Sequence, residues 1–116
     1  MVRRLPAFSD LHAVGVCKTL LATHAGLGRR LSAAFLIAKN IAVADLEVTQ
    51  VPKITLPWPH GALAEARALM GPDPWPYGVA ANLQVLETQL RWSRLDGLQA
   101  RGVALDELFA ADCLAT

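Results

Sequence analysis

The sequence predicts a helix-rich α/β fold, and three observations support this. Apolar side chains recur at three- and four-residue steps over much of the chain, which is the spacing of one face of a helix. One short apolar segment contains β-branched residues and is bounded by small ones, which favours a strand. Hydrophobic residues make up 53% of the 116 residues, and much of the excess is Ala and Leu, both strong helix formers. We expect about four helices beside one or two strands.

The strand is expected at "LHAVGVC", residues 11–17. Its nearly continuous apolar character is typical of a strand buried on both faces, as in a mainly parallel sheet. A second extended piece is expected at "KITLPW", residues 53–58, which combines β-branched residues with Pro57. A strand cannot satisfy its own backbone hydrogen-bonding groups. Because the chain offers few partners, we expect the sheet to be incomplete.

The longest helix is expected between Leu27 and Leu46. Gly26 and Gly28 weaken its first turn. Its apolar positions follow the helical period and form one stripe: Leu27, Leu31, Ala34, Phe35, Ala38, Ile41, Ala42 and Leu46.

Shorter helices are expected further along the chain. The segment "HGALAEARALMG", residues 60–71, is expected to end at Gly71. The next helix is expected to run from Val79 to Gly97, the position of a C-terminal glycine. The segment "LDELFA", residues 105–110, predicts a final helical turn with an apolar docking face.

These helices present more apolar surface than the expected sheet can cover. We therefore expect residues 1–116 to form a single partial domain, part of a longer protein, that self-associates through exposed apolar helix faces.

Charge and hydropathy exclude several classes of protein. The formal net charge of +1 argues against a nucleic-acid partner, which needs a basic face. No apolar run reaches the ~18–20 residues of a membrane span. Pro6, Asp10 and His12 interrupt the apolar region that a signal peptide would need, so we expect a cytoplasmic protein.

No motif identifies a cofactor or a metal site. Cys17 and Cys113 lack metal-ligand spacing and are expected to be free thiols. The three histidines are scattered, and none pairs at the helical spacing that indicates zinc. His12 lies within the expected strand. A buried histidine needs a hydrogen-bond partner, which the protein can supply, or it serves as a ligand or catalytic group.

The stretch "GPDPWPYG", residues 71–78, is stiff and bulky for a helix connection. Trp75 and Tyr77 are held there by prolines. Aromatic groups on a rigid backbone suit an aromatic ligand, because little entropy is lost on binding. They equally suit a corner that packs against the flanking helices. The sequence favours the packed corner.

This stretch resembles the C-terminal end of the 4,5-dihydroxyphthalate decarboxylase family. The resembling residues are "LMGPDPWPYG" with the helix that follows, the closing "ELF" at residues 107–109, "LPW" at residues 56–58, and Phe35 to Lys39. The strand around His12 is similar to the family's "MH" strand, with Leu11 in place of the methionine. The resemblance spans nearly the whole chain, but only the last third of the family's length.

The resemblance implies an incomplete lobe of a type II periplasmic-binding-protein-like fold. It implies a small aromatic carboxylate as ligand, His12 as the catalytic acid, and Trp75 and Tyr77 as substrate-binding candidates. It leaves three functions open: a piece of a decarboxylase that is inactive alone, a piece of a transporter's solute-binding protein, or a structural relic. A truncated reading frame and a stand-alone chain that pairs with another are both compatible with it.

Overall fold

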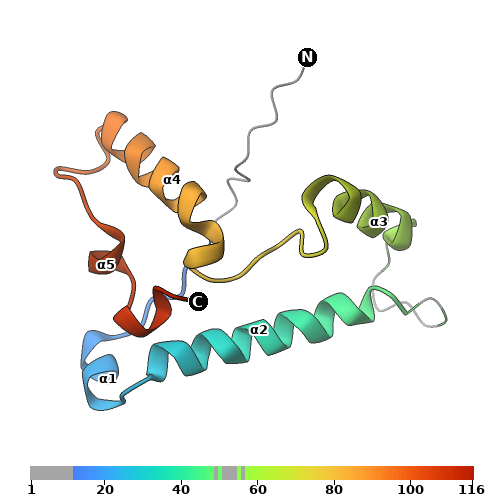
Figure 1. Ribbon diagram of the computed structural model, residues 1–116, viewed down its shortest axis with the longest axis horizontal. Helices are drawn as coiled ribbons and strands as arrows, with labels where there is room; N and C mark the ends of the chain where they lie inside the picture. The colour runs from blue at the N-terminus through green and yellow to red at the C-terminus, as the bar shows by residue number, and fades with distance from the viewer. Residues whose placement is uncertain (1–11, 49, 51–54, 56) are drawn as a thin grey trace.

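The structure is a computed structural model that describes residues 12–48, 50, 55 and 57–116. Figure 1 shows an open arrangement of helices. In chain order the elements are α1 (Lys18–Thr23), α2 (Leu27–Asp45), α3 (Pro59–Met70), the 3₁₀ turn η1 (Ala80–Asn82), α4 (Leu83–Leu95), α5 (Leu105–Leu108) and the 3₁₀ turn η2 (Ala111–Cys113).

The α/β prediction is wrong for the described residues, which contain helices and turns but no strand. Residues 12–17 precede α1 without secondary structure, and half of the expected strand at 53–58, residues 53, 54 and 56, lies outside the described residues. The physical reason is the lack of partner strands. An isolated strand leaves its backbone groups without a ladder, and no neighbouring strand is available in this part of the chain. The expectation of an incomplete type II periplasmic-binding-protein-like lobe, which contains a sheet, is therefore wrong for the described residues.

The expected helices are confirmed, because local signals define their ends. The backbone turns at Gly26 with φ of 72° immediately before α2. Pro59 occupies the first turn of α3, where its missing N–H costs no hydrogen bond. Gly71 ends α3 at φ of 99°, and Gly97 follows α4 at φ of 72°. Both glycines adopt the left-handed region that other residues avoid.

The helices do not enclose a common core. In Figure 1, α2 runs along one side, α4 lies beyond its N-terminal half and α3 lies near its C-terminal end. Within the described residues, Val79 is the one buried hydrophobic side chain, at 7% exposure. Leu95 remains 76% exposed, and large apolar side chains of α2 and α3 are exposed as well. The apolar stripes that predicted the helices are therefore largely uncovered.

A tight junction joins η2 to the start of α2. The Asp112 carboxylate accepts a hydrogen bond from the Arg29 backbone N–H at 3.0 Å, which satisfies a free donor of the first helical turn. Gly28 is buried beneath it. A Cβ at this glycine would lie 2.7 Å from Asp112 Oδ1 and 2.8 Å from Cys113 Sγ. The close approach of η2 therefore depends on the missing side chain.

Thr116 completes a second contact, at the start of α4. The Ala80 N–H donates to the Thr116 carbonyl at 2.7 Å. A Cβ at Gly78 would lie 2.5 Å from the same carbonyl oxygen. Residues 110–116 consequently tie the start of α4 to the start of α2, as Figure 1 shows.

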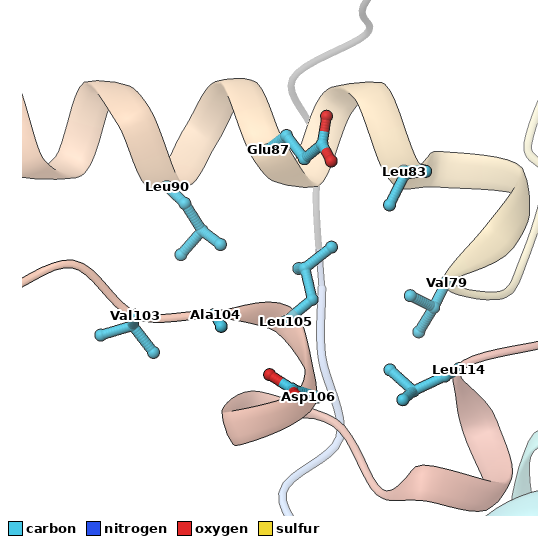
Figure 2. A pocket seen from close by; sticks show the side chains of 9 residues that line it. All are labelled: Val79, Leu83, Glu87, Leu90, Val103, Ala104, Leu105, Asp106 and Leu114. Atoms are coloured by element: carbon cyan, nitrogen blue, oxygen red, sulfur yellow. The ribbon is translucent and has the colours of Figure 1, made fainter.

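Two ion pairs lie elsewhere on the surface. Arg67 of α3 contacts Glu47, just after α2, at 2.6 Å. Arg101 contacts Glu107 of α5 at 2.6 Å. Between α4 and the segment around α5 lies an apolar groove (Figure 2). Among the described helices, none combines the length and the apolar character needed to cross a membrane.

Candidate functional site

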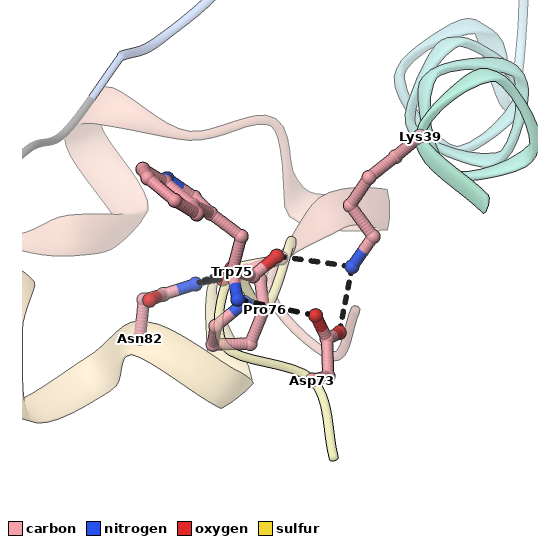
Figure 3. Close-up of polar contacts among 6 residues, drawn as sticks. Lys39, Asp73, Trp75, Pro76 and Asn82 are labelled. Carbon is pink, nitrogen blue, oxygen red and sulfur yellow. Dashed lines mark hydrogen bonds and ion pairs between the residues drawn. The ribbon is translucent and has the colours of Figure 1, made fainter. Parts of the chain in front are cut away.

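A cluster of polar contacts surrounds residues 71–78, which we name the WPYG corner. Lys39 reaches it from the middle of α2 (Figure 3). Its ammonium contacts Asp73 Oδ2 at 2.6 Å and donates to the Trp75 carbonyl at 3.0 Å. The Lys39 side chain is only 7% exposed, whereas that of Asp73 is 50% exposed. A nearly buried ammonium needs such partners, because an unpaired one would be costly to desolvate.

Short-range hydrogen bonds fix the backbone of the corner. Asp73 Oδ1 accepts from the Trp75 N–H at 3.2 Å, in the manner of an Asx turn. Asn82 of η1 donates from its amide to the carbonyls of Pro76 and Gly78, each at 2.8 Å. Prolines lack an N–H and fix φ, so carbonyls are the groups that the corner offers. Lys39 and Asn82 supply the matching donors from two sides.

The aromatic side chains of the corner are partly exposed. Lys39 Nζ lies 4.9 Å from the centre of the Tyr77 ring, within the range of a cation–π interaction. The Trp75 indole is directed away from Lys39 (Figure 3). Trp75 is 53% exposed and Tyr77 48% exposed. The expectation that these rings are buried against the flanking helices is therefore wrong for this structure, and polar contacts anchor the corner instead.

The electrostatics limit what the corner can bind. The charge of Lys39 is matched by Asp73, so an anionic ligand would have to displace that carboxylate to use the cation. What remains accessible is the surface of the two rings. The geometry therefore suits a flat apolar or aromatic group better than an anion alone.

His12 lies in the segment ahead of α1 and is exposed. The expected burial of His12 within a strand is therefore wrong. Lys39 contacts the Trp75 carbonyl and lies over the Tyr77 ring, and His12 precedes α1 in the chain. His12 as an acid, and Trp75 and Tyr77 as ligand contacts, stay predictions.

The roles of Lys39 and Asn82 were not predicted from the sequence. The signal for Lys39 was a charged residue inside an otherwise apolar helical run, which calls for a partner. Its partner Asp73 lies 34 positions later. No local pattern links residues at such a distance.

Other reactive groups lie apart from the corner. Cys17 and Cys113 are free thiols, as predicted. A hydrogen bond with the Thr19 side chain lowers the pKa of the Cys17 thiol. Within the described part of the chain, no three His, Cys, Asp or Glu residues are grouped so that they could hold a metal ion.

The Glu107 carboxyl is unusually acidic. The Arg101 guanidinium holds its carboxylate in a two-pronged contact, at 3.0 and 2.6 Å. The Ala104 N–H also donates to it, at 3.0 Å. These hydrogen bonds lower the pKa of Glu107 to about 2, and the same contact raises the pKa of Arg101. The pair closes the first turn of α5 and is exposed, which fits a structural role.

The fold and the corner define a helical segment that presents a polar-anchored aromatic turn. Its sequence is similar to that of the 4,5-dihydroxyphthalate decarboxylase of Comamonas testosteroni, with 39% identity over 106 residues. The match covers 91% of this chain and 32% of the relative, so the chain spans about a third of the length of the curated relative it matches. This confirms the resemblance predicted from the sequence. No protein-family model matches the chain.

Proposed function

We propose that this chain supplies part of an aromatic-acid decarboxylase of the 4,5-dihydroxyphthalate type, and that it is inactive without the remainder. The observation that carries the proposal is the 39% identity to the Comamonas testosteroni decarboxylase over 91% of the chain. The remainder corresponds to the two thirds of that protein outside the match. We expect the complete protein to act in the cytoplasm.

The WPYG corner is the proposed ligand contact. Trp75 and Tyr77 are about half exposed, and their backbone is fixed by Lys39 and Asn82. A dihydroxylated benzene ring stacks on such faces with little loss of side-chain entropy. The carboxylates of the substrate would be bound chiefly by groups from the remainder, since Asp73 already matches the charge of Lys39.

The reaction needs an acid at the ring. The bond between a ring carbon and one carboxylate breaks, carbon dioxide leaves, and the electron pair stays on the carbon. A proton then replaces the carbon dioxide. His12 is the proposed proton donor, and this role requires its imidazole to reach the ring bound at the corner.

Solute binding without chemistry is the second candidate, as in a transporter's binding protein. The observation that favours it is the composition of the corner. Its exposed groups are aromatic and its cation is paired. Such a corner offers ring faces to a solute, while its charges are already matched. A structural relic without ligand is the remaining alternative.

A chimera distinguishes these functions. This chain would replace the matched third of the Comamonas testosteroni decarboxylase, and the chimera and the isolated chain would be incubated with 4,5-dihydroxyphthalate. We expect enzyme-dependent carbon dioxide from the chimera and none from the isolated chain. His12→Ala should abolish release, while His24→Ala, an exposed histidine after α1, should leave it intact.

The other results are equally informative. Release from the isolated chain would contradict the proposed inactivity. A folded chimera that binds the substrate without releasing carbon dioxide would favour the solute-binding function. A folded chimera that does neither would favour the relic.

A further inference from the structure

An apolar groove separates α4 from the segment that carries α5. Its volume is about 580 Å³. Figure 2 shows side chains of α4 facing those of the opposite segment across it. The lining residues are Val79, Leu83, Glu87, Leu90, Val103, Ala104, Leu105, Asp106 and Leu114.

The groove combines apolar walls with acidic side chains. Leu83 and Leu90 come from α4, and Leu105 lies across from them (Figure 2). Glu87 lies on the α4 wall and Asp106 on the opposite side (Figure 2). None of the ion pairs formed by the described residues involves either carboxylate. An occupant with an apolar face and a basic group would complement both features.

Further apolar side chains outside the groove are exposed on α4 and just after it. Trp92 and Leu95 are exposed on the helix, and Leu98 follows it at 79% exposure. Exposed apolar side chains in this number are typical of a protein that is covered by a partner.

We propose that this groove is the seat of a polypeptide segment from the remaining two thirds of the decarboxylase-type protein, one that presents apolar side chains beside a Lys or Arg. The chain spans 32% of its relative, so most of the apolar partners of a complete protein lie outside it. A second copy is the alternative occupant, and the test below distinguishes it. The inference concerns association and does not depend on the proposed reaction.

Co-expression provides the test. A tagged form of this chain would be produced together with the unmatched two thirds of the Comamonas testosteroni decarboxylase. We expect a one-to-one complex on purification. Leu90→Asp, which places a charge in the groove, should weaken it on the order of 100-fold, the loss typical of a central interface residue. Gln89→Asp, an exposed neighbour on α4 that does not line the groove, should leave binding unchanged.

A second variant guards against misfolding of the first. Glu87→Lys keeps a helix-forming residue at an exposed site, and circular dichroism would verify its helix content. We expect binding about 10-fold weaker at low salt, with a smaller difference at 1 M salt, because screening removes the charge term.

Each remaining outcome overturns the proposal. These are failure to form the complex, and a complex unaffected by Leu90→Asp and Glu87→Lys. A discrete homodimer of the isolated chain that Leu90→Asp abolishes would assign the groove to a second copy. Because the readout is binding, a complex that forms without decarboxylation would refute the proposed activity and leave this inference standing.

Discussion

The polar junctions and the apolar helix faces of this chain differ in how many of their groups have partners. At the WPYG corner and at the junction of η2 with α2, polar groups find partners within the chain, as Lys39 finds Asp73 and the Arg29 N–H finds Asp112. Along the described helix faces, apolar side chains such as Leu95 remain largely exposed. A hydrogen bond needs one well-placed partner, whereas burying a helix face needs a second surface of similar size.

This contrast explains how the described part of the chain forms helices that bury little apolar surface. Helix boundaries follow from glycines, prolines and backbone hydrogen bonds close in sequence. Most helix stability, however, comes from packing of an apolar face. The WPYG corner and the η2 junction therefore fix how the helices are connected. We expect the stability of the helices to depend on apolar surface supplied by another polypeptide.

The largest expected effect comes from breaking the corner with Lys39→Met. This change leaves Asp73 and the Trp75 carbonyl without their donor. Because Asp73 is half exposed, we expect a loss of about 2 kcal/mol, below the 3–5 kcal/mol of a fully buried pair. Urea unfolding of the complex or the chimera would measure it.

Lys18→Met is the matched control, since Lys18 is exposed on α1. It should change the free energy of unfolding by less than about 0.5 kcal/mol. Equal effects of the two substitutions would show that Lys39 does not anchor the corner.

Gly28→Ala tests the η2 junction. The added methyl group meets Asp112 and Cys113 at 2.7–2.8 Å, so we expect destabilisation of about 1–2 kcal/mol despite the better helix propensity of alanine. Gly61→Ala in α3 meets nothing within 4 Å and should stabilise by up to about 1 kcal/mol. Thermal unfolding would compare them, and a stabilising Gly28→Ala would refute the close approach.

Asp112→Ala removes the acceptor for the first turn of α2. A lost helix cap costs about 1 kcal/mol, and the Arg29 amide should exchange its hydrogen faster. Asp112→Asn keeps an acceptor oxygen and should lie between the parent and Asp112→Ala. Unchanged exchange at Arg29 in Asp112→Ala would contradict the hydrogen bond.

The smallest effect is the pH response of the Arg101–Glu107 pair. The pKa of Glu107 in the folded chain is about 2, below its usual value of about 4.3. The contribution of the pair is therefore present above about pH 4.3 and is lost as the pH falls through 2. A carboxyl titration by NMR should show this low pKa, and Arg101→Gln should raise it. A Glu107 pKa near 4.3 in the parent chain would show that the ion pair with Arg101 does not form.

The helices could be predicted because their signals are local. The apolar period of α2, Pro59 at the start of α3, and Gly71 and Gly97 at two helix ends are each visible within a few residues. The sheet was predicted wrongly because a strand depends on partners elsewhere in a chain. Residues 12–17 have the composition of a buried strand, but composition supplies no ladder.

The candidate site was predicted in part. The proline-rich stretch marked Trp75 and Tyr77 through its unusual stiffness. The partners Lys39 and Asn82 come from α2 and η1 and carry no pattern that points to the corner. The predicted burial of the two rings failed for the same reason as the sheet, since the covering surface is absent from the described residues.

Side-chain footprinting with hydroxyl radicals tests the central contrast most directly, because it reads exposure residue by residue. It would be applied to the isolated chain at a concentration where sedimentation shows a monomer, with circular dichroism confirming helix content. We predict strong labelling of Leu95 and Leu98 and protection of Val79, which are 76%, 79% and 7% exposed. Protection of all three in a helical monomer would show that the chain forms its own core, and would contradict the need for an outside partner.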